Sequence, residues 1–219
     1  MLGDIRDVVL LHGIWSHGVS MFVIRRQLER EYGARVRFFN YPSIRGALDS
    51  NAGALARFLE RAGLEAVHLI GHSLGGVVAL RTLATHDNLP PGRLVCLGSP
   101  LTGSRAAEFL SKQDWAEGLL GSTLPAGVLR ESANEWGSHV CEQREVGIIA
   151  GNVPLGVGRI VTNFGGPSDG TVAVSETRLA GARDHLIMPV SHRGMVLSRQ
   201  VADQAWSFLH RGRFLRERD

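Results

Sequence analysis

The sequence predicts an α/β fold, a three-layer, doubly wound domain around a mostly parallel sheet of about six strands. Short apolar runs alternate along the chain with segments of helical periodicity. These runs are continuously apolar rather than alternating, which is typical of strands that are buried on both faces of a parallel sheet. A length of 219 residues suits one sizeable core, so we expect a single domain over residues 1–219.

Each expected strand is short, contains β-branched or large apolar residues, and ends near glycine, proline or a polar turn. We expect strands at residues 8–11, 36–39, 67–70, 94–97, 146–150 and 186–190. We expect helices at residues 20–32, 47–62, 73–85 and 196–209.

The segment between the fourth and fifth expected strands is longer than a crossover connection requires. It contains an amphipathic stripe with Phe109, Trp115, Leu119 and Leu120. One interpretation is an ordinary crossover helix with a long loop, and the other is a cap over a pocket. The apolar surface of Trp115 and the leucines favours a cap or lid within residues 101–144.

Composition excludes several classes of function. A net charge of +3 is too small to argue for a nucleic-acid partner. His and Cys residues show no metal-ligand spacing, so we expect neither a metal nor a cofactor. Two cysteines, Cys96 and Cys141, make no disulfide framework, and whether they pair stays open. The first apolar run is too short for a signal peptide or a membrane span, so we expect a cytoplasmic protein without a transmembrane segment.

The sharpest motif is Gly71-His72-Ser73-Leu74-Gly75-Gly76, which directly follows an expected strand and opens an expected helix. A serine hydroxyl is a weak nucleophile, so it must project toward both a base and the substrate. A strained strand-to-helix turn achieves this, and glycines allow the close packing around it. Ser73 is therefore the candidate nucleophile.

A glycine-containing loop, His12 to Gly18, follows the first expected strand. A tetrahedral intermediate requires two backbone donors, for which we predict the N–H groups of Ile14 and Leu74. We expect His12 to shape this loop through backbone bonds and to do no acid–base work. Trp15 either lines an acyl pocket or packs.

A base and an acid must complete the set, and in this architecture they follow the serine in the order Asp, then His. Asp169 and His192 both fall beyond the ends of expected strands, where sites form in open α/β sheets. Asp184 and His185 precede their expected strand, so we place them at the opposite edge of the sheet. Asp203 falls within the last helix.

Together, His12-Gly13, Gly71 to Gly76, Asp169-Gly170-Thr171-Val172 and His192 resemble the α/β-hydrolase superfamily, and within it the small bacterial lipases and carboxylesterases. The resemblance covers nearly the whole chain. It implies a triad of Ser73, Asp169 and His192. Side chains in loops after the first and fourth expected strands are the candidates for binding substrate; these are Trp15, Leu101, Phe109 and Trp115.

These observations favour a serine hydrolase that acts on a small-molecule ester or lipid. An acyltransferase or a thioesterase could use the same three residues, and a non-catalytic binding relative could keep the fold. The intact Ser, Asp and His set speaks against the last alternative.

Overall fold

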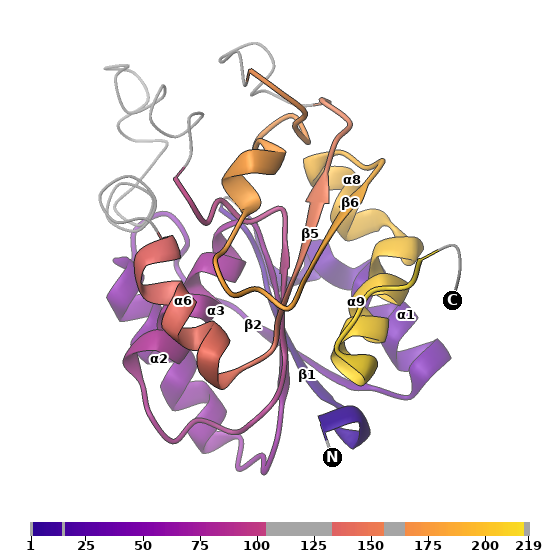
Figure 1. The fold of residues 1–219 in the computed structure, drawn as a ribbon. Coiled ribbons are helices and arrows are strands. Elements are labelled where there is room, and N and C mark those ends of the chain that lie inside the picture. The colour runs from indigo at the N-terminus through magenta and orange to yellow at the C-terminus, as the bar shows by residue number, and fades with distance from the viewer. Residues whose placement is uncertain (1, 15, 104–132, 156–164, 217–219) are drawn as a thin grey trace.

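The computed structural model describes residues 2–14, 16–103, 133–155 and 165–216. Within these ranges, six parallel strands form one sheet in the order β2-β1-β3-β4-β5-β6 (Figure 1), which confirms the predicted fold class. The strands are β1 (Asp7–Leu11), β2 (Arg35–Phe39), β3 (His68–His72), β4 (Leu94–Leu97), β5 (Val146–Gly151) and β6 (Asp184–Met188). The chain runs outward from β1 to β2 and then returns to β3, so the order reverses between β1 and β3. Ligands of open α/β sheets bind beyond the carboxyl ends of the strands at such a reversal.

Strand β1 shows why the strand sequences are continuously apolar. Successive side chains of a strand point to opposite faces. Val9 and Leu11 belong to the core on one face of the sheet, whereas Val8 and Leu10 belong to the core on the other. All four side chains have no exposed surface, so a polar residue at any of these positions would face apolar core.

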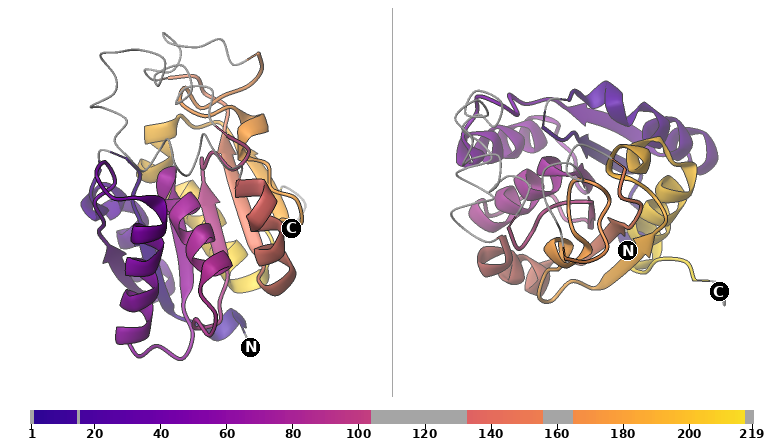
Figure 2. Two further views of the ribbon diagram at one scale, coloured as in Figure 1. Left: turned by 90° about the vertical axis from the view of Figure 1, so that its left-hand side faces the viewer. Right: turned by 90° about the horizontal axis from the view of Figure 1, so that it is seen from above.

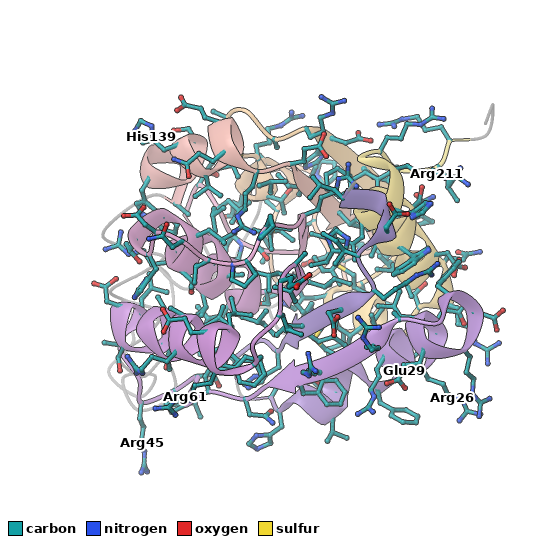
Figure 3. The ribbon with its side chains drawn as sticks, turned by 90° about the horizontal axis from the view of Figure 1, so that it is seen from below. Arg26, Glu29, Arg45, Arg61, His139 and Arg211 are labelled. Carbon is teal, nitrogen blue, oxygen red and sulfur yellow. The ribbon has the colours of Figure 1, made fainter. Side chains whose placement is uncertain are left out.

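Helices cover both faces of the sheet, giving the expected three layers (Figure 2). One core contains residues of α2, α3 and α6, and the other contains residues of α1, α8 and α9. The helices are α1 (Phe22–Tyr32), α2 (Leu48–Arg61), α3 (Leu74–Thr85), α6 (Ala133–Gln143), α8 (His192–Leu197) and α9 (Arg199–Arg211). Exposed polar or charged side chains on the outer surfaces of helices in both layers include Arg26, Arg61, His139 and Arg211 (Figure 3).

Several predicted boundaries were wrong, and the structure gives the physical reason for three of them. Helix α1 starts at Phe22 because residues 18–21 form a 3₁₀ turn before it. Strand β6 starts at Asp184 rather than at residue 186, since Asp184 and His185 pair with β5. The last predicted helix is two helices, because Ser198 has an extended backbone and caps α9 by accepting a hydrogen bond from the Val201 N–H at 3.3 Å.

Helix α6 provides the connection that leads into β5, and it packs on α3. A Cβ atom at Gly137 of α6 would lie only 2.7 Å from a methyl carbon of Leu80 on α3, so the two helices approach closely there. The predicted amphipathic stripe with Phe109, Trp115, Leu119 and Leu120 lies outside the described residues. In the described part of the chain, no helix is both long and apolar enough to span a membrane.

Candidate active site

Ser73 occupies the turn between β3 and α3 in a conformation that side chains rarely adopt. Its φ is +55° and its ψ is −122°, and α3 begins at the next residue, Leu74. A non-glycine residue with such angles is strained and persists only where its surroundings fix it. Here the Ser73 N–H donates to the Leu97 carbonyl at 2.8 Å, and the Ser73 carbonyl accepts from the Gly76 N–H at 3.1 Å.

The three glycines of the motif allow the chain to pack tightly around this turn. A Cβ at Gly71 would lie 2.4 Å from the backbone nitrogen of Gly76, and one at Gly75 would lie 2.4 Å from the Leu11 carbonyl oxygen of β1. A Cβ at Gly76 would lie 2.1 Å from the hydroxyl oxygen of Ser99. Real Cβ atoms do not approach other atoms so closely, so each glycine serves the close approach that the motif predicted.

Asp169 and His192 form a buried hydrogen-bonded pair. The His192 Nδ1 lies 2.7 Å from the Asp169 Oδ2, and the His192 N–H donates to the Asp169 carbonyl at 2.9 Å. The other carboxylate oxygen accepts from the N–H groups of Thr171 at 2.9 Å and Val172 at 2.7 Å. Asp169 is only 1% exposed, so these bonds replace the water that would otherwise solvate its charge.

This pairing fixes the tautomer of His192. An ionised carboxylate only accepts hydrogen bonds, so the Nδ1 of His192 carries the proton that it donates to Asp169. The Nε2 is then left with a lone pair that can accept a proton from another group. The pair is therefore an imidazole ring held in one orientation, with its Nδ1 directed at a buried carboxylate.

Ser73, Asp169 and His192 all lie at the carboxyl edge of the sheet. They follow β3, β5 and β6, respectively, and His192 is the first residue of α8 rather than part of a loop. His72, next to the serine, links them, because its ring lies 4.7 Å from that of His192. The structure thus places these three predicted residues at one edge, near the reversal between β1 and β3.

Gly98 is a site residue that the sequence reasoning missed. It follows β4 with a φ of +55°, and a Cβ there would lie 2.9 Å from the Asp169 Oδ2 and 3.2 Å from the His192 Nδ1. A side chain at this position would press on the Asp–His hydrogen bond. Its position directly after an expected strand was the signal that could have found it.

The loop after β1 also lies close to Ser73. A Cβ at Gly13 would lie 3.1 Å from the Cβ of Ser73, so this loop runs against the turn. His12 donates through its Nδ1 to the Gly13 carbonyl at 2.8 Å, and its Nε2 accepts from the Tyr41 N–H at 3.4 Å. The expected backbone bond of His12 is thus present. Burial lowers the pKa of His12 and favours its neutral form.

The two residues predicted as backbone donors lie at the start of α3 and in the loop after β1. Leu74 is the first residue of α3, and the first N–H groups of a helix have no acceptor within it. Ile14 follows Gly13 in the loop and is half buried. Their role as donors to an oxyanion stays a prediction.

Of the predicted substrate-binding residues, Trp15, Phe109 and Trp115 lie outside the described residues. Leu101 is fully buried in the core that contains α2 and α3, and its N–H donates to the Glu176 carbonyl at 2.7 Å. Its predicted contact with substrate stays a prediction.

The alternative acids and bases have other partners. Asp184 binds Arg216 at 2.7 Å and accepts from the Phe214 N–H at 2.9 Å, and its pKa is lowered chiefly by the Arg216 hydrogen bond. His185 bonds the Thr177 hydroxyl at 2.9 Å. Asp203 accepts hydrogen bonds from two residues of α1. These contacts agree with the placement of Asp184 and Asp203 away from the site.

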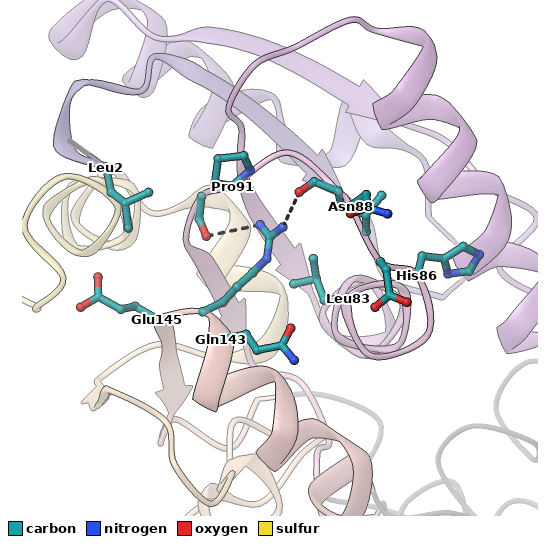
Figure 4. A pocket seen from close by; sticks show the side chains of 11 residues that line it. Leu2, Leu83, His86, Asn88, Pro91, Gln143 and Glu145 are labelled. Atoms are coloured by element: carbon teal, nitrogen blue, oxygen red, sulfur yellow. Dashed lines mark hydrogen bonds between the residues drawn. The ribbon is translucent and has the colours of Figure 1, made fainter.

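A cavity of about 420 Å³ lies at the opposite, amino-terminal edge of the sheet (Figure 4). Arg144 lines this cavity and donates to the Leu89 carbonyl at 3.1 Å and the Gly92 carbonyl at 3.4 Å. Asp87 and Glu145 also line it. None of the residues that line this cavity belongs to the carboxyl-edge site.

The fold and this edge define a class of protein, in which a parallel α/β sheet carries a serine at a strained strand-to-helix turn. The chain belongs to the alpha/beta hydrolase family, whose model matches residues 8–153. A comparison with curated protein sequences gives no match.

Solved structures with the same fold include bacterial lipases and esterases. The mature form of the Bacillus licheniformis lipase BlEst2 matches with a TM-score of 0.70 at 19% identity, over 87% of this chain and 86% of that one. The esterase EaEST from Exiguobacterium antarcticum matches with a TM-score of 0.64 at 18% identity, over 93% of this chain and 91% of that one. At these identities the similarity shows the fold alone.

Proposed function

We propose that this chain is a serine hydrolase that cleaves carboxylic esters through an acyl-enzyme on Ser73. The observation that carries the proposal is the buried Asp169–His192 pair, at 2.7 Å, on the same sheet edge as the strained Ser73. An aspartate with its charge buried and a histidine with a fixed tautomer have the properties of an acid–base pair that serves a nucleophile. Membership of the family and the lipase and esterase structures of the same fold support a hydrolase.

In the proposed mechanism, the Nε2 of His192 takes the proton from the Ser73 hydroxyl as its oxygen attacks the ester carbonyl carbon. The oxyanion that forms accepts hydrogen bonds from the N–H groups of Ile14 and Leu74. When the tetrahedral intermediate collapses, the bond to the alcohol oxygen breaks and His192 donates its proton to that oxygen. His192 then takes a proton from water as the water oxygen attacks the acyl carbon. The bond between that carbon and the Ser73 oxygen breaks, His192 returns the proton to Ser73, and the acid leaves.

The decisive test compares the wild type with Ser73→Ala on 4-nitrophenyl butyrate. Removing a triad serine typically lowers kcat by about a million-fold, so Ser73→Ala should show no enzymatic turnover. Circular dichroism and thermal melting must show that the variant is folded. Turnover near the wild-type rate in folded Ser73→Ala would refute the proposal.

A substrate panel then separates ester hydrolysis from its alternatives. Ester, thioester and amide substrates of matched acyl group rank the bond that is cleaved, and product analysis with an added alcohol detects acyl transfer. We propose short-to-medium acyl chains as the preferred substrates. A pocket gains about 0.8 kcal/mol for each methylene it buries, so kcat/KM should rise with acyl length and then fall when the pocket is full.

The same panel tests the proposed cap within residues 101–144. If Trp115 covers the acyl chain, Trp115→Ala should flatten the dependence of kcat/KM on acyl length. An unchanged profile would favour the crossover interpretation of that segment. A wild-type profile that keeps rising into long chains would point to a lipase with a larger pocket.

A further inference from the structure

His72, the residue before the strained serine, contacts a residue 120 positions later in the chain. Its Nε2 lies 3.0 Å from the backbone carbonyl oxygen of His192. A carbonyl oxygen can only accept a hydrogen bond, so the Nε2 of His72 carries a proton and donates it. The two rings are in contact, with centroids 4.7 Å apart and an angle of 44° between their planes.

The protonation state of His72 keeps this donor in place. The ring is buried, and burial, followed by the neighbouring His192, lowers the pKa of His72 to about 3. The neutral ring has one N–H group, and the bond to His192 fixes it on the Nε2. The opposite nitrogen, Nδ1, faces the loop after β1, where a Cβ at Gly13 would lie 3.2 Å from it.

His72 therefore supplies a contact to the base that Asp169 does not. Asp169 holds the His192 ring at Nδ1 and the His192 backbone at its N–H group. His72 holds the backbone at the other side of the same residue, through the carbonyl group. His72 and Ser73 are adjacent in the chain. This hydrogen bond therefore couples the position of the proposed base, His192, to the position of the proposed nucleophile, Ser73.

We propose that His72 is a positioning residue that holds the His192 backbone in register with Ser73, and thereby sets the distance from base to nucleophile. This inference rests on the proposed function, in which His192 accepts the Ser73 proton. A displacement of about 1 Å between reacting groups can cost roughly 100-fold in rate, so one backbone hydrogen bond of this kind has a measurable effect.

A matched pair of amides tests the hydrogen bond apart from packing. In His72→Gln, the side-chain nitrogen can reach the position of the imidazole Nε2 and can donate to the His192 carbonyl. In His72→Asn, the amide ends near the position of Nδ1 and is too short to reach it. His72→Leu keeps apolar volume without any donor.

The expected result is a change in kcat rather than in KM. With 4-nitrophenyl butyrate, His72→Asn and His72→Leu should lower kcat by about 10- to 100-fold with KM within about twofold, and His72→Gln should recover most of the lost rate. Rates are expressed per folded molecule after thermal melting. Equal kcat values in the Gln, Asn and Leu variants, or a wild-type kcat in His72→Asn, would overturn the proposal.

His68→Asn is the control at the opposite end of the same strand. His68 is also a buried histidine of β3, and its Nδ1 accepts from the Arg93 N–H at 2.9 Å. The Asn oxygen can take over that acceptor. This variant should keep kcat per folded molecule, so a fall that matched His72→Asn would mean that any disturbance of β3 slows the enzyme, and would overturn the specific role of His72.

A spectroscopic measurement separates failure of this inference from failure of the proposed function. The proton shared by the His192 Nδ1 and Asp169 should give a low-field proton resonance in the NMR spectrum, whether or not the protein hydrolyses esters. We expect this resonance to be kept in His72→Gln and shifted or broadened in His72→Asn. If the wild type hydrolysed no ester, the proposed function would fall, while an unchanged resonance in all His72 variants would by itself refute positioning by His72.

Discussion

Strand β3 carries a buried histidine at each end, and the two differ in what they contact. Burial is the first cause that lowers the pKa of both, to about 4 for His68 and about 3 for His72. His68 accepts a hydrogen bond from Arg93, beside the neighbouring strand, whereas His72 donates to a residue that follows the last strand. Burial of a histidine therefore does not by itself distinguish the end of β3 that lies at the candidate site from the other end.

The two edges of the sheet also differ in the features that they carry. The amino-terminal edge has the 420 Å³ cavity and ion pairs such as Arg216 with Asp184, at 2.7 Å. The carboxyl edge has a serine with strained backbone and the buried Asp169–His192 pair. Strain and polar groups that converge from distant parts of the chain identify the candidate site here, and the described cavity does not.

The largest expected difference between the edges is the effect on kcat of replacing one aspartate at each edge. Asp169→Asn should lower kcat by about 10,000-fold, because the amide favours the wrong tautomer of His192 and provides no charge partner. Asp184→Asn removes a partner of Arg216 at the other edge and should leave kcat nearly unchanged. Steady-state kinetics of both variants on one ester give the comparison, and a larger loss from Asp184→Asn would contradict the account.

Two glycines, one at each edge of the sheet, allow the effect of tight backbone packing to be compared between the edges. A Cβ at Gly75 would lie 2.4 Å from the Leu11 carbonyl oxygen, and one at Gly92 would lie 1.9 Å from the Val67 carbonyl oxygen. Both alanine variants should lose stability, by roughly 1–3 kcal/mol or more, because each forces a backbone shift. Only Gly75→Ala should also lower kcat per folded molecule, by about 100-fold, since it moves the turn that carries Ser73.

Chemical denaturation measures the loss of stability in each glycine variant, and active-site titration gives kcat per folded molecule. If Gly92→Ala lowered kcat per folded molecule as much as Gly75→Ala, the two edges would not be independent.

The smallest expected effect is a pH dependence of stability at the amino-terminal edge. His68 stays neutral in the folded protein down to about pH 4, whereas a histidine in the unfolded chain binds its proton near pH 6.5. Unfolding therefore takes up a proton between these values, and stability falls as the pH drops through this window. One such group contributes at most about 1.4 kcal/mol per pH unit.

His68→Asn should reduce this slope by up to one proton relative to the wild type. Burial also lowers the pKa values of His12, His72 and His185, so part of the slope should remain. Urea unfolding at pH 7 and pH 5 measures it. An identical slope in the variant and the wild type would show that His68 is not held neutral in the folded state.

The sequence was sufficient to predict the sheet and to single out Ser73 as the candidate nucleophile, because both inferences depend on local signals. Continuous apolar runs mark strands that are buried on two faces, and Gly-x-Ser-x-Gly between a strand and a helix marks a tight turn. The structure confirms the six strands and contains a hydrogen bond between Asp169 and His192, while the catalytic roles of Ser73, Asp169 and His192 stay predictions.

The features that the sequence did not predict depend on contacts between distant segments. Strand β6 begins at a polar residue because Asp184 finds its partners in Phe214 and Arg216, about 30 residues later. The role of Gly98 follows from the approach of Asp169 and His192, which meet beside Gly98 only in the folded chain. The hydrogen bond from His72 to the His192 carbonyl likewise depends on how β3 and α8 are arranged in the folded chain.

The site at which a fluorophosphonate reacts with the protein tests directly whether Ser73 is the nucleophile. Such a probe forms a stable bond to a serine that an adjacent base activates, so it reports the nucleophile without knowledge of the natural substrate. We expect one phosphonate per wild-type molecule by intact mass, located on Ser73 by peptide mapping, with strongly slowed labelling of Asp169→Asn. A wild-type protein that stays unlabelled, or a label on another serine, would contradict the assignment of Ser73 as the nucleophile.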